Sequence, residues 1–320
     1  MKIVRLLVAT CLAGTAALAL PVSGQTYPSR PVRLVVPFPA GSATDTIARL
    51  IASDLQESFG QPFVLDNKPG AQGIIGSEIV ARSAPDGYTL LVAAVSFAAA
   101  ESLFKKVPYD TEKDFTPVSR LVSTPLALLV KPEFPARTPQ EFIAYLKANP
   151  GKLSAGYGSS SSQVSIAQLR SMAKVDVIDA PYKGIPLAIN DVLGGTLAFT
   201  FADLGNAMAQ VKGGTLRAIA VTSEKRNTLV PDWPALSEVL PGYDLDAWIA
   251  LIAPKGLPKD IAQKLHEATL KALAKPEVRS RLNTVGFTSS PLGPDQMGPF
   301  IKAEVDKWAK LVKQAGIQPE

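Results

Sequence analysis

The chain has 320 residues and a net charge of +5, from 33 basic and 28 acidic side chains. Hydrophobic residues make up 47% and charged residues 19%, which argues against intrinsic disorder. No dense cluster of basic residues points to nucleic-acid binding. His266 and Cys11 are the only histidine and cysteine, so a His/Cys metal site lacks ligands. A Ser-His-Asp triad could use only His266, and a Cys-His dyad would need Cys11. We expect no metal, no cofactor and no nucleic-acid partner.

Residues 1–24 have the pattern of a secretory signal peptide. A positively charged start precedes an uncharged apolar run at 6–20, and small residues follow up to Gly24. The run has about 15 residues, fewer than the roughly 20 that span a bilayer, although a membrane anchor and a cut after Ala19 stay as alternatives. Cleavage after Gly24 would remove Cys11 and leave an exported, periplasmic protein without thiols.

Apolar runs alternate with amphipathic stretches along the rest of the chain. Between residues 47 and 59, five apolar side chains share one helical face. Thr138 and Glu141 form a capping box with proline at the first helical position, and a last helix is predicted from Asp295 to about Ala315. The extended apolar runs predict buried strands at 32–36, 63–65, 90–95, 127–130, 175–178, 197–201, 217–221 and 248–252.

Strands that alternate with helices predict an α/β protein with parallel sheets covered on both faces. Nearly 300 residues after the leader suggest two such units, and no flexible linker divides them. We therefore expect two lobes that share strands across a hinge, with crossings near 124–126 and 248–252. The first lobe is predicted to comprise residues 25–124 and 251–320, and the second lobe residues 125–250.

Four loops between a predicted strand and a predicted helix are rich in small and polar residues, at 37–45, 66–73, 156–163 and 180–184. In parallel sheets such loops gather at the carboxyl ends of the strands, where ligands bind. Small residues let a ligand reach backbone N–H groups, and helix N-termini favour negative charge. The loops carry few cations, so they suit a carboxylate that is held by backbone amides and hydroxyls. The alternative interpretation is that their Gly and Ser residues only form ordinary turns between strands and helices.

Short matches to enzyme and nucleotide motifs lack their usual context. Residues 70–76 are spaced G-x-x-G-x-x-G, which differs from both the dinucleotide and the P-loop patterns. The S-x-x-K match at 171–174 has no partner motif and reads as helix surface. His266 falls in an amphipathic stretch at 261–274 and is predicted to be a solvated helical residue rather than a catalytic one.

The ordered set of loop sequences resembles the Bug-type solute receptors of tripartite tricarboxylate transporters. The similarity covers essentially the whole chain after the leader. Each matching segment is short and only modestly specific by itself, but the segments in this order are specific to the family. The segments that carry it are Tyr-Pro-Ser-Arg-Pro-Val-Arg at 27–33, Val-Pro-Phe-Pro-Ala-Gly at 36–41, Asn-Lys-Pro-Gly-Ala-Gln-Gly at 67–73, Pro-Asp-Gly-Tyr-Thr-Leu at 85–90, Pro-Tyr-Lys-Gly at 181–184, Leu-Arg-Ala-Ile-Ala-Val-Thr-Ser at 216–223, Trp-Ala-Lys at 308–310 and Ala-Gly-Ile at 315–317.

The resemblance implies a two-lobed periplasmic-binding-protein fold whose cleft binds a small carboxylate. In the family the carboxylate meets the first two loops largely through backbone groups and bridging waters. Two departures, Ser42 in place of a glycine and Gln163 in place of a histidine, affect the ligand's distal contacts, and Tyr157 narrows the cleft. The ligand-binding residues expected are Phe38, Ala40, Ser42, Gly70, Ala71, Gly73 and Ser96 in the first lobe, and Tyr157, Gly158, Ser159, Ser160, Gln163, Lys183 and Asp203 in the second.

The function expected is a periplasmic receptor, not an enzyme, that captures an organic carboxylate and delivers it to membrane transporter subunits. We expect a monomer whose lobes close on the ligand by a hinge motion. Three alternatives stay open: a ligand sensor for a signalling system, an exported hydrolase or transferase that uses Ser or Asp residues with Lys183, and an interaction protein with a vestigial cleft.

Overall fold

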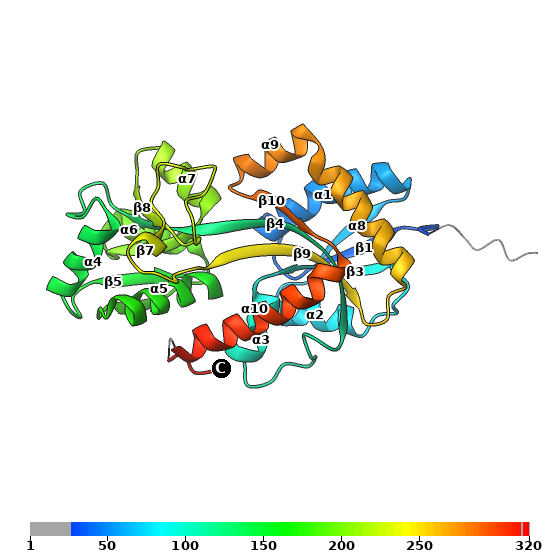
Figure 1. Ribbon diagram of the computed structural model, residues 1–320, viewed down its shortest axis with the longest axis horizontal. Helices are drawn as coiled ribbons and strands as arrows, with labels where there is room; N and C mark the ends of the chain where they lie inside the picture. The colour runs from blue at the N-terminus through cyan, green and yellow to red at the C-terminus, as the bar shows by residue number, and fades with distance from the viewer. Residues whose placement is uncertain (1–26, 315, 320) are drawn as a thin grey trace, which may run out of the picture.

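Two lobes joined by long strands form the molecule, as the computed structural model in Figure 1 shows. The structure describes residues 27–314 and 316–319, so the predicted signal peptide at 1–24 lies outside the described residues. The strands are β1 (Val32–Val36), β2 (Phe63–Asn67), β3 (Thr89–Ala94), β4 (Phe115–Val130), β5 (Ser154–Tyr157), β6 (Ile178–Pro181), β7 (Phe199–Asp203), β8 (Arg217–Val221), β9 (Asp246–Pro254) and β10 (Thr288–Leu292). The α-helices are α1 (Ala43–Phe59), α2 (Ile74–Ala81), α3 (Ser96–Leu103), α4 (Pro139–Ala148), α5 (Ser160–Ala173), α6 (Ile185–Gly194), α7 (Leu204–Lys212), α8 (Lys259–Ala274), α9 (Pro276–Thr284) and α10 (Pro294–Gln314), with short 3-10 turns at Ala71–Gly73 and Leu236–Glu238.

A single strand path, β2-β1-β3-β9-β4-β7-β5-β6, runs through both lobes. The first lobe contains the parallel strands β2, β1 and β3, which continue into antiparallel β9 and β4, with β10 on β4. The second lobe contains parallel β6, β5 and β7, with β7 and β8 antiparallel to β4. The two sheets are therefore mixed rather than purely parallel, and β4 belongs to both. The predicted α/β, two-lobed fold is confirmed.

The strand pairing locates both crossings between the lobes. β4 pairs with β9 up to Pro125 and with β7 from Leu126 onward, close to the predicted crossing at 124–126. The second crossing comes before β9, because the whole of β9 pairs within the first lobe. The sequence predicted that residues 246–250 belong to the second lobe. Their strand partners lie in β3 and β4, so these residues pair with the first lobe.

Local sequence signals account for most element boundaries. α1 begins after Ser42, whose side chain accepts the Asp45 N–H, and ends at Gly60 in a left-handed conformation. α4 begins after Thr138, whose hydroxyl accepts the Glu141 N–H, while the Glu141 carboxylate bonds the Arg137 N–H instead of closing the predicted box.

Two further predictions along the chain were wrong. The strand predicted at 175–178 lies at Ile178–Pro181, on the edge of the sheet, where Ile178 is 55% exposed. His266 is buried rather than solvated, and its Nδ1 lies 3.0 Å from the Ser119 hydroxyl. Burial lowers the pKa of His266, so the ring is neutral in neutral solution. Among the described helices none combines the length and the apolar character needed to cross a bilayer.

Candidate functional site

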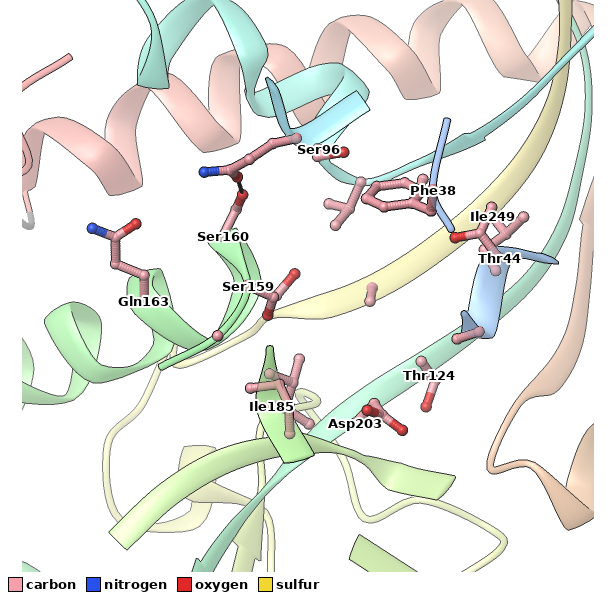
Figure 2. Close-up of a pocket in the computed structure, with 18 of the residues that line it drawn as sticks. Phe38, Thr44, Ser96, Thr124, Ser159, Ser160, Gln163, Ile185, Asp203 and Ile249 are labelled. Atoms are coloured by element: carbon pink, nitrogen blue, oxygen red, sulfur yellow. Dashed lines mark hydrogen bonds between the residues drawn. The ribbon is translucent and has the colours of Figure 1, made fainter. Parts of the chain in front are cut away.

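A cavity of about 470 Å³ lies between the lobes and takes its walls from both of them. Figure 2 shows Phe38, Thr44 and Ser96 of the first lobe facing it, with Ser159, Ser160 and Gln163 of the second lobe opposite. A cavity of this size fits a small molecule. It opens at the carboxyl ends of the parallel strands in both lobes, where an α/β sheet gathers its ligand-binding loops.

Nine of the fourteen residues expected from the sequence line this cavity. Ser42 lies behind it as the cap of α1, and Gly73 packs behind the wall, where an added Cβ would meet Ser96 Oγ at 3.5 Å and Phe38 at 3.7 Å. Ala40, Gly70 and Ala71 also lie outside the lining. The nine lining residues are Phe38, Ser96, Tyr157, Gly158, Ser159, Ser160, Gln163, Lys183 and Asp203.

A buried carboxylate holds the first two loops together. Asp45 accepts the Gly41 N–H at 2.9 Å, the Asn67 side-chain amide at 2.9 Å and both Arg49 guanidinium bonds. Burial opposes ionisation of Asp45, but these donors hold its pKa below the ordinary value. The same Asn67 amide donates to the Phe38 carbonyl at 3.0 Å. This network fixes the backbone that carries Phe38 into the cavity.

The second loop reaches the cavity through a residue that the sequence did not single out. Ala71 and Gln72 adopt positive φ values of 44° and 50°. This turn carries the Gln72 side chain across the cavity, where its amide oxygen accepts a hydrogen bond from Ser160 of the other lobe, the dashed line in Figure 2. Gln72 rather than its neighbours therefore forms the wall at this point.

The helices α1 and α5 point their N-termini at the cavity from opposite lobes, and both begin in the same way. A serine cap, Ser42 or Ser159, accepts the N–H of the third helical residue. The first two N–H groups of a helix have no partner inside it, and in both helices the first two residues line the cavity. The second helical residue of each, Thr44 or Ser161, is a mostly buried residue that lines the cavity, and its hydroxyl has no hydrogen-bond partner among the described residues.

Side chains near the two crossings form the floor of the cavity. Thr124 and Leu126 come from β4, and Trp248 comes from β9. The Trp248 indole N–H donates to the buried Glu304 carboxylate at 2.7 Å, which fixes the plane of the ring. Asp203 caps α7 by accepting the Asn206 N–H at 3.1 Å, so part of its carboxylate is already engaged.

Lys183 is an exposed cation at the cavity wall, and within the described part of the chain it forms no ion pair. Its loop packs against Gly158, two residues before α5, and the rest of the cavity lining is mostly apolar and hydroxyl-bearing. The arrangement attracts an anion without a fixed cationic clamp.

Fourteen lining residues were not predicted from the sequence. Some of these residues are next to predicted ones in the sequence, so including the neighbours of each predicted loop residue would have identified them. Those on β9, and Phe287 before β10, reach the site only through long-range pairing, which no local signal reveals. The unpredicted lining residues are Ala43, Thr44, Gln72, Ala94, Val95, Thr124, Leu126, Ser161, Tyr182, Ile185, Ala247, Trp248, Ile249 and Phe287.

Two mixed sheets, the strand β4 that belongs to both of them and a cavity between the lobes define a solute-binding protein of the periplasmic-binding-protein type. The model of the tripartite tricarboxylate transporter family receptor matches residues 47–317. BugT of Bordetella pertussis is 37% identical over 309 residues, 94% of this chain and 94% of that protein. The chain belongs to the tripartite tricarboxylate transporter receptor family, and the resemblance to Bug-type receptors is confirmed.

Solved structures agree with this assignment. The R. palustris protein Rpa4515, with adipate, superposes with a TM-score of 0.83 at 32% identity and covers 92% of this chain and 100% of that one. MatC from Rhodopseudomonas palustris, with bound malate, gives a TM-score of 0.77 at 33% identity and covers 89% of this chain and 100% of that one. As a member of this family the chain is a solute-binding receptor.

Proposed function

We propose that the protein is a periplasmic receptor that binds a small dicarboxylate in the interlobe cavity and delivers it to membrane transporter subunits. The observation that carries the proposal is the pair of helix N-termini, α1 and α5, that face one cavity from opposite lobes. Relatives solved with adipate and with malate support the same ligand class.

One carboxylate is placed at the start of α1. There it accepts the N–H groups of Ala43 and Thr44 and the Thr44 hydroxyl, where the helix dipole favours negative charge. The network around Asp45 fixes this end before a ligand arrives, so little backbone ordering is needed on binding.

The other carboxylate is placed at the start of α5. Its partners are the N–H groups of Ser160 and Ser161, the Ser161 hydroxyl and the Lys183 ammonium. Because the two ends belong to different lobes, a dicarboxylate favours the closed arrangement by contacting both. A monocarboxylate of the same length leaves one helix N-terminus without an anionic partner.

Transport rather than chemistry is the role that the cavity supports. Apart from the Lys183 ammonium, the donors are backbone amides and hydroxyls. The buried Asp45 carboxylate already accepts four hydrogen bonds, and His266 lies outside the lining. Family membership and the leader expected at residues 1–24 support a periplasmic location and membrane subunits as partners.

The test is thermal unfolding of protein that has been unfolded and refolded to remove bound ligand, measured against dicarboxylates of increasing length. Each compound is paired with its monoamide as a matched control. A dicarboxylate at a hundredfold excess over its dissociation constant stabilises the native state by about 2.7 kcal/mol, and the monoamide does so at much higher concentration. The compound is recovered unchanged after long incubation, whereas its consumption would support the hydrolase or transferase alternative. No shift with any acid contradicts the proposal.

Single substitutions locate the binding. Ser161→Ala removes one hydrogen bond to a charged group and is expected to weaken binding by about 1.5–3 kcal/mol, while Lys183→Met weakens it and reduces its dependence on salt. Ser165→Ala is the control, because Ser165 lies one turn further along α5 and bonds the Ser161 carbonyl away from the cavity. Equal affinities for the Ser161 and Ser165 variants would argue against a carboxylate at this helix end.

A further inference from the structure

The two lobes touch directly through a pair of glycines beside the cavity. Gly205 is the second residue of α7 in the second lobe, and Gly286 precedes β10 in the first lobe. A Cβ on Gly205 would lie 2.3 Å from the Val285 carbonyl oxygen, and a Cβ on Gly286 would lie 2.2 Å from the Gly205 nitrogen. Both obstacles are backbone atoms, so no side-chain rotation relieves either clash.

This contact belongs to the wall of the cleft rather than to the outside of the molecule. Asp203, two residues before Gly205, lines the cavity, and so does Phe287, directly after Gly286. The Thr124 hydroxyl donates to the Gly286 carbonyl at 2.7 Å and anchors it to β4, next to the point where that strand changes lobes. The glycine pair therefore meets close to the hinge, on the cleft side.

A second contact joins the lobes away from this pair, where Ser160 bonds Gln72 across the cavity. These two contacts join the lobes beside the cavity, and α5 of the second lobe also packs against α10 and α3 of the first lobe. The polar contact can be remade through water, whereas two backbones in van der Waals contact set a fixed limit to approach.

We infer that the backbone contact between Gly205 and Gly286 sets how closely the two lobes approach each other. The absence of side chains at this contact lets the cavity reach its closed form. An alanine at Gly205 needs roughly 1 Å more separation to reach ordinary contact distance from Val285. Because the pair lies near the hinge, that displacement grows toward the cleft mouth. Gly205 is therefore a positioning residue for closure, with no contact to ligand required.

Gly205→Ala is a clean substitution, because Gly205 has an ordinary helical conformation and alanine is the better helix former. Gly286 is less suitable, since its φ of +79° strains any side chain. The matched control is Gly194→Ala in α6 of the same lobe, where the nearest atom to an added Cβ is 4.0 Å away.

The experiment traps the closed arrangement with a short bifunctional thiol reagent. Gln72→Cys and Ser160→Cys place one thiol on each lobe at a contact of the closed form, and Cys11→Ser removes the chain's only natural cysteine. The rate of intramolecular cross-linking then measures how often the lobes close, even when closure is brief. Single-cysteine variants show no such product, and a monofunctional reagent checks that each thiol keeps its reactivity.

In this background Gly205→Ala is expected to slow cross-linking by about fivefold or more, and Gly194→Ala to leave the rate unchanged. Equal rates for Gly205→Ala and its parent overturn the inference, and so does a parent that never cross-links. The measurement needs no ligand. Its failure therefore leaves the dicarboxylate proposal standing, and a failed ligand screen leaves this inference untouched.

Discussion

Asp246 is a half-buried carboxylate at the first residue of β9, where the chain enters the first lobe for the second time. Its Oδ1 atom is buried and has no hydrogen-bond partner among the described residues. Burial, with a contribution from the nearby Asp244 and a smaller one from Glu304, raises the pKa of Asp246 to about 6, and Lys307 and Arg120 only partly offset this. The charged form of Asp246 is therefore destabilised by folding.

The pKa gives the size and the sign of the effect. The native pKa of about 6 exceeds the ordinary 3.8, so the folded state binds more protons than the unfolded state between these values. The contribution of Asp246 to stability is therefore most favourable below pH 4, falls as the pH rises from about 4 to about 6, and levels off above that. Two pKa units correspond to roughly 3 kcal/mol, and partial contact with solvent reduces the expected penalty to about 1–2 kcal/mol.

Asp246→Asn removes the charge at every pH. The variant is expected to raise the free energy of unfolding by about 1–2 kcal/mol at pH 8, with a gain that shrinks as the pH falls toward 4. Urea denaturation across this range measures it. Asp232→Asn, at an exposed position, is the control and should change stability little at any pH. If the gain for Asp246→Asn is absent, or does not vary with pH, the Asp246 carboxylate does not destabilise the folded state.

Two further substitutions test the crossings. The Thr222 hydroxyl accepts the Leu126 N–H at 2.8 Å and donates to the Leu245 carbonyl at 2.6 Å. Thr222→Val therefore leaves one buried, unpaired group in each crossing segment. We expect it to lower the free energy of unfolding, measured by urea denaturation, by about 2–4 kcal/mol. A loss below that of an exposed Thr→Val control would contradict this role. Trp248→Phe leaves the buried Glu304 carboxylate without its 2.7 Å donor and should lower the free energy of unfolding by about 2 kcal/mol; unchanged stability at neutral pH is the opposing result.

The elements predicted best from the sequence are those with local signals. β1 matches its prediction residue for residue, because four of its five residues are apolar and buried, and only Arg33 interrupts the run. The last helix is found within a residue at each end because its apolar face repeats over five turns. β6 was displaced by three residues because it is an edge strand with an exposed face, so its apolar content is low.

The first half of β4 was missed for a different reason. Residues 115–125 contain Pro117 and Pro125, and the register with β9 shifts twice, so no regular alternation is visible. The same long-range pairing brings Trp248 and Phe287 to the cavity floor. Their roles could not be predicted because they depend on which strand lies next to β4.

The site loops themselves were predictable, since four turns rich in small residues follow four strands. The choice of side chain within a loop was harder. Gln72 reaches the cavity because Ala71 and Gln72 both adopt positive φ, a conformation that their residue types do not indicate. The sequence thus shows which polar residues a loop contains, whereas the direction of a single side chain depends on the backbone geometry of the loop.

The most direct test of the account is a crystal structure of the refolded protein grown with the dicarboxylate that gives the largest thermal shift. We expect density for one carboxylate at the N-terminus of α1, near Thr44, and for the other at the N-terminus of α5, near Ser161. A ligand bound outside the cavity between the lobes, or bound inside it with both carboxylates away from these helix ends, would show that the helix N-termini do not bind the dicarboxylate.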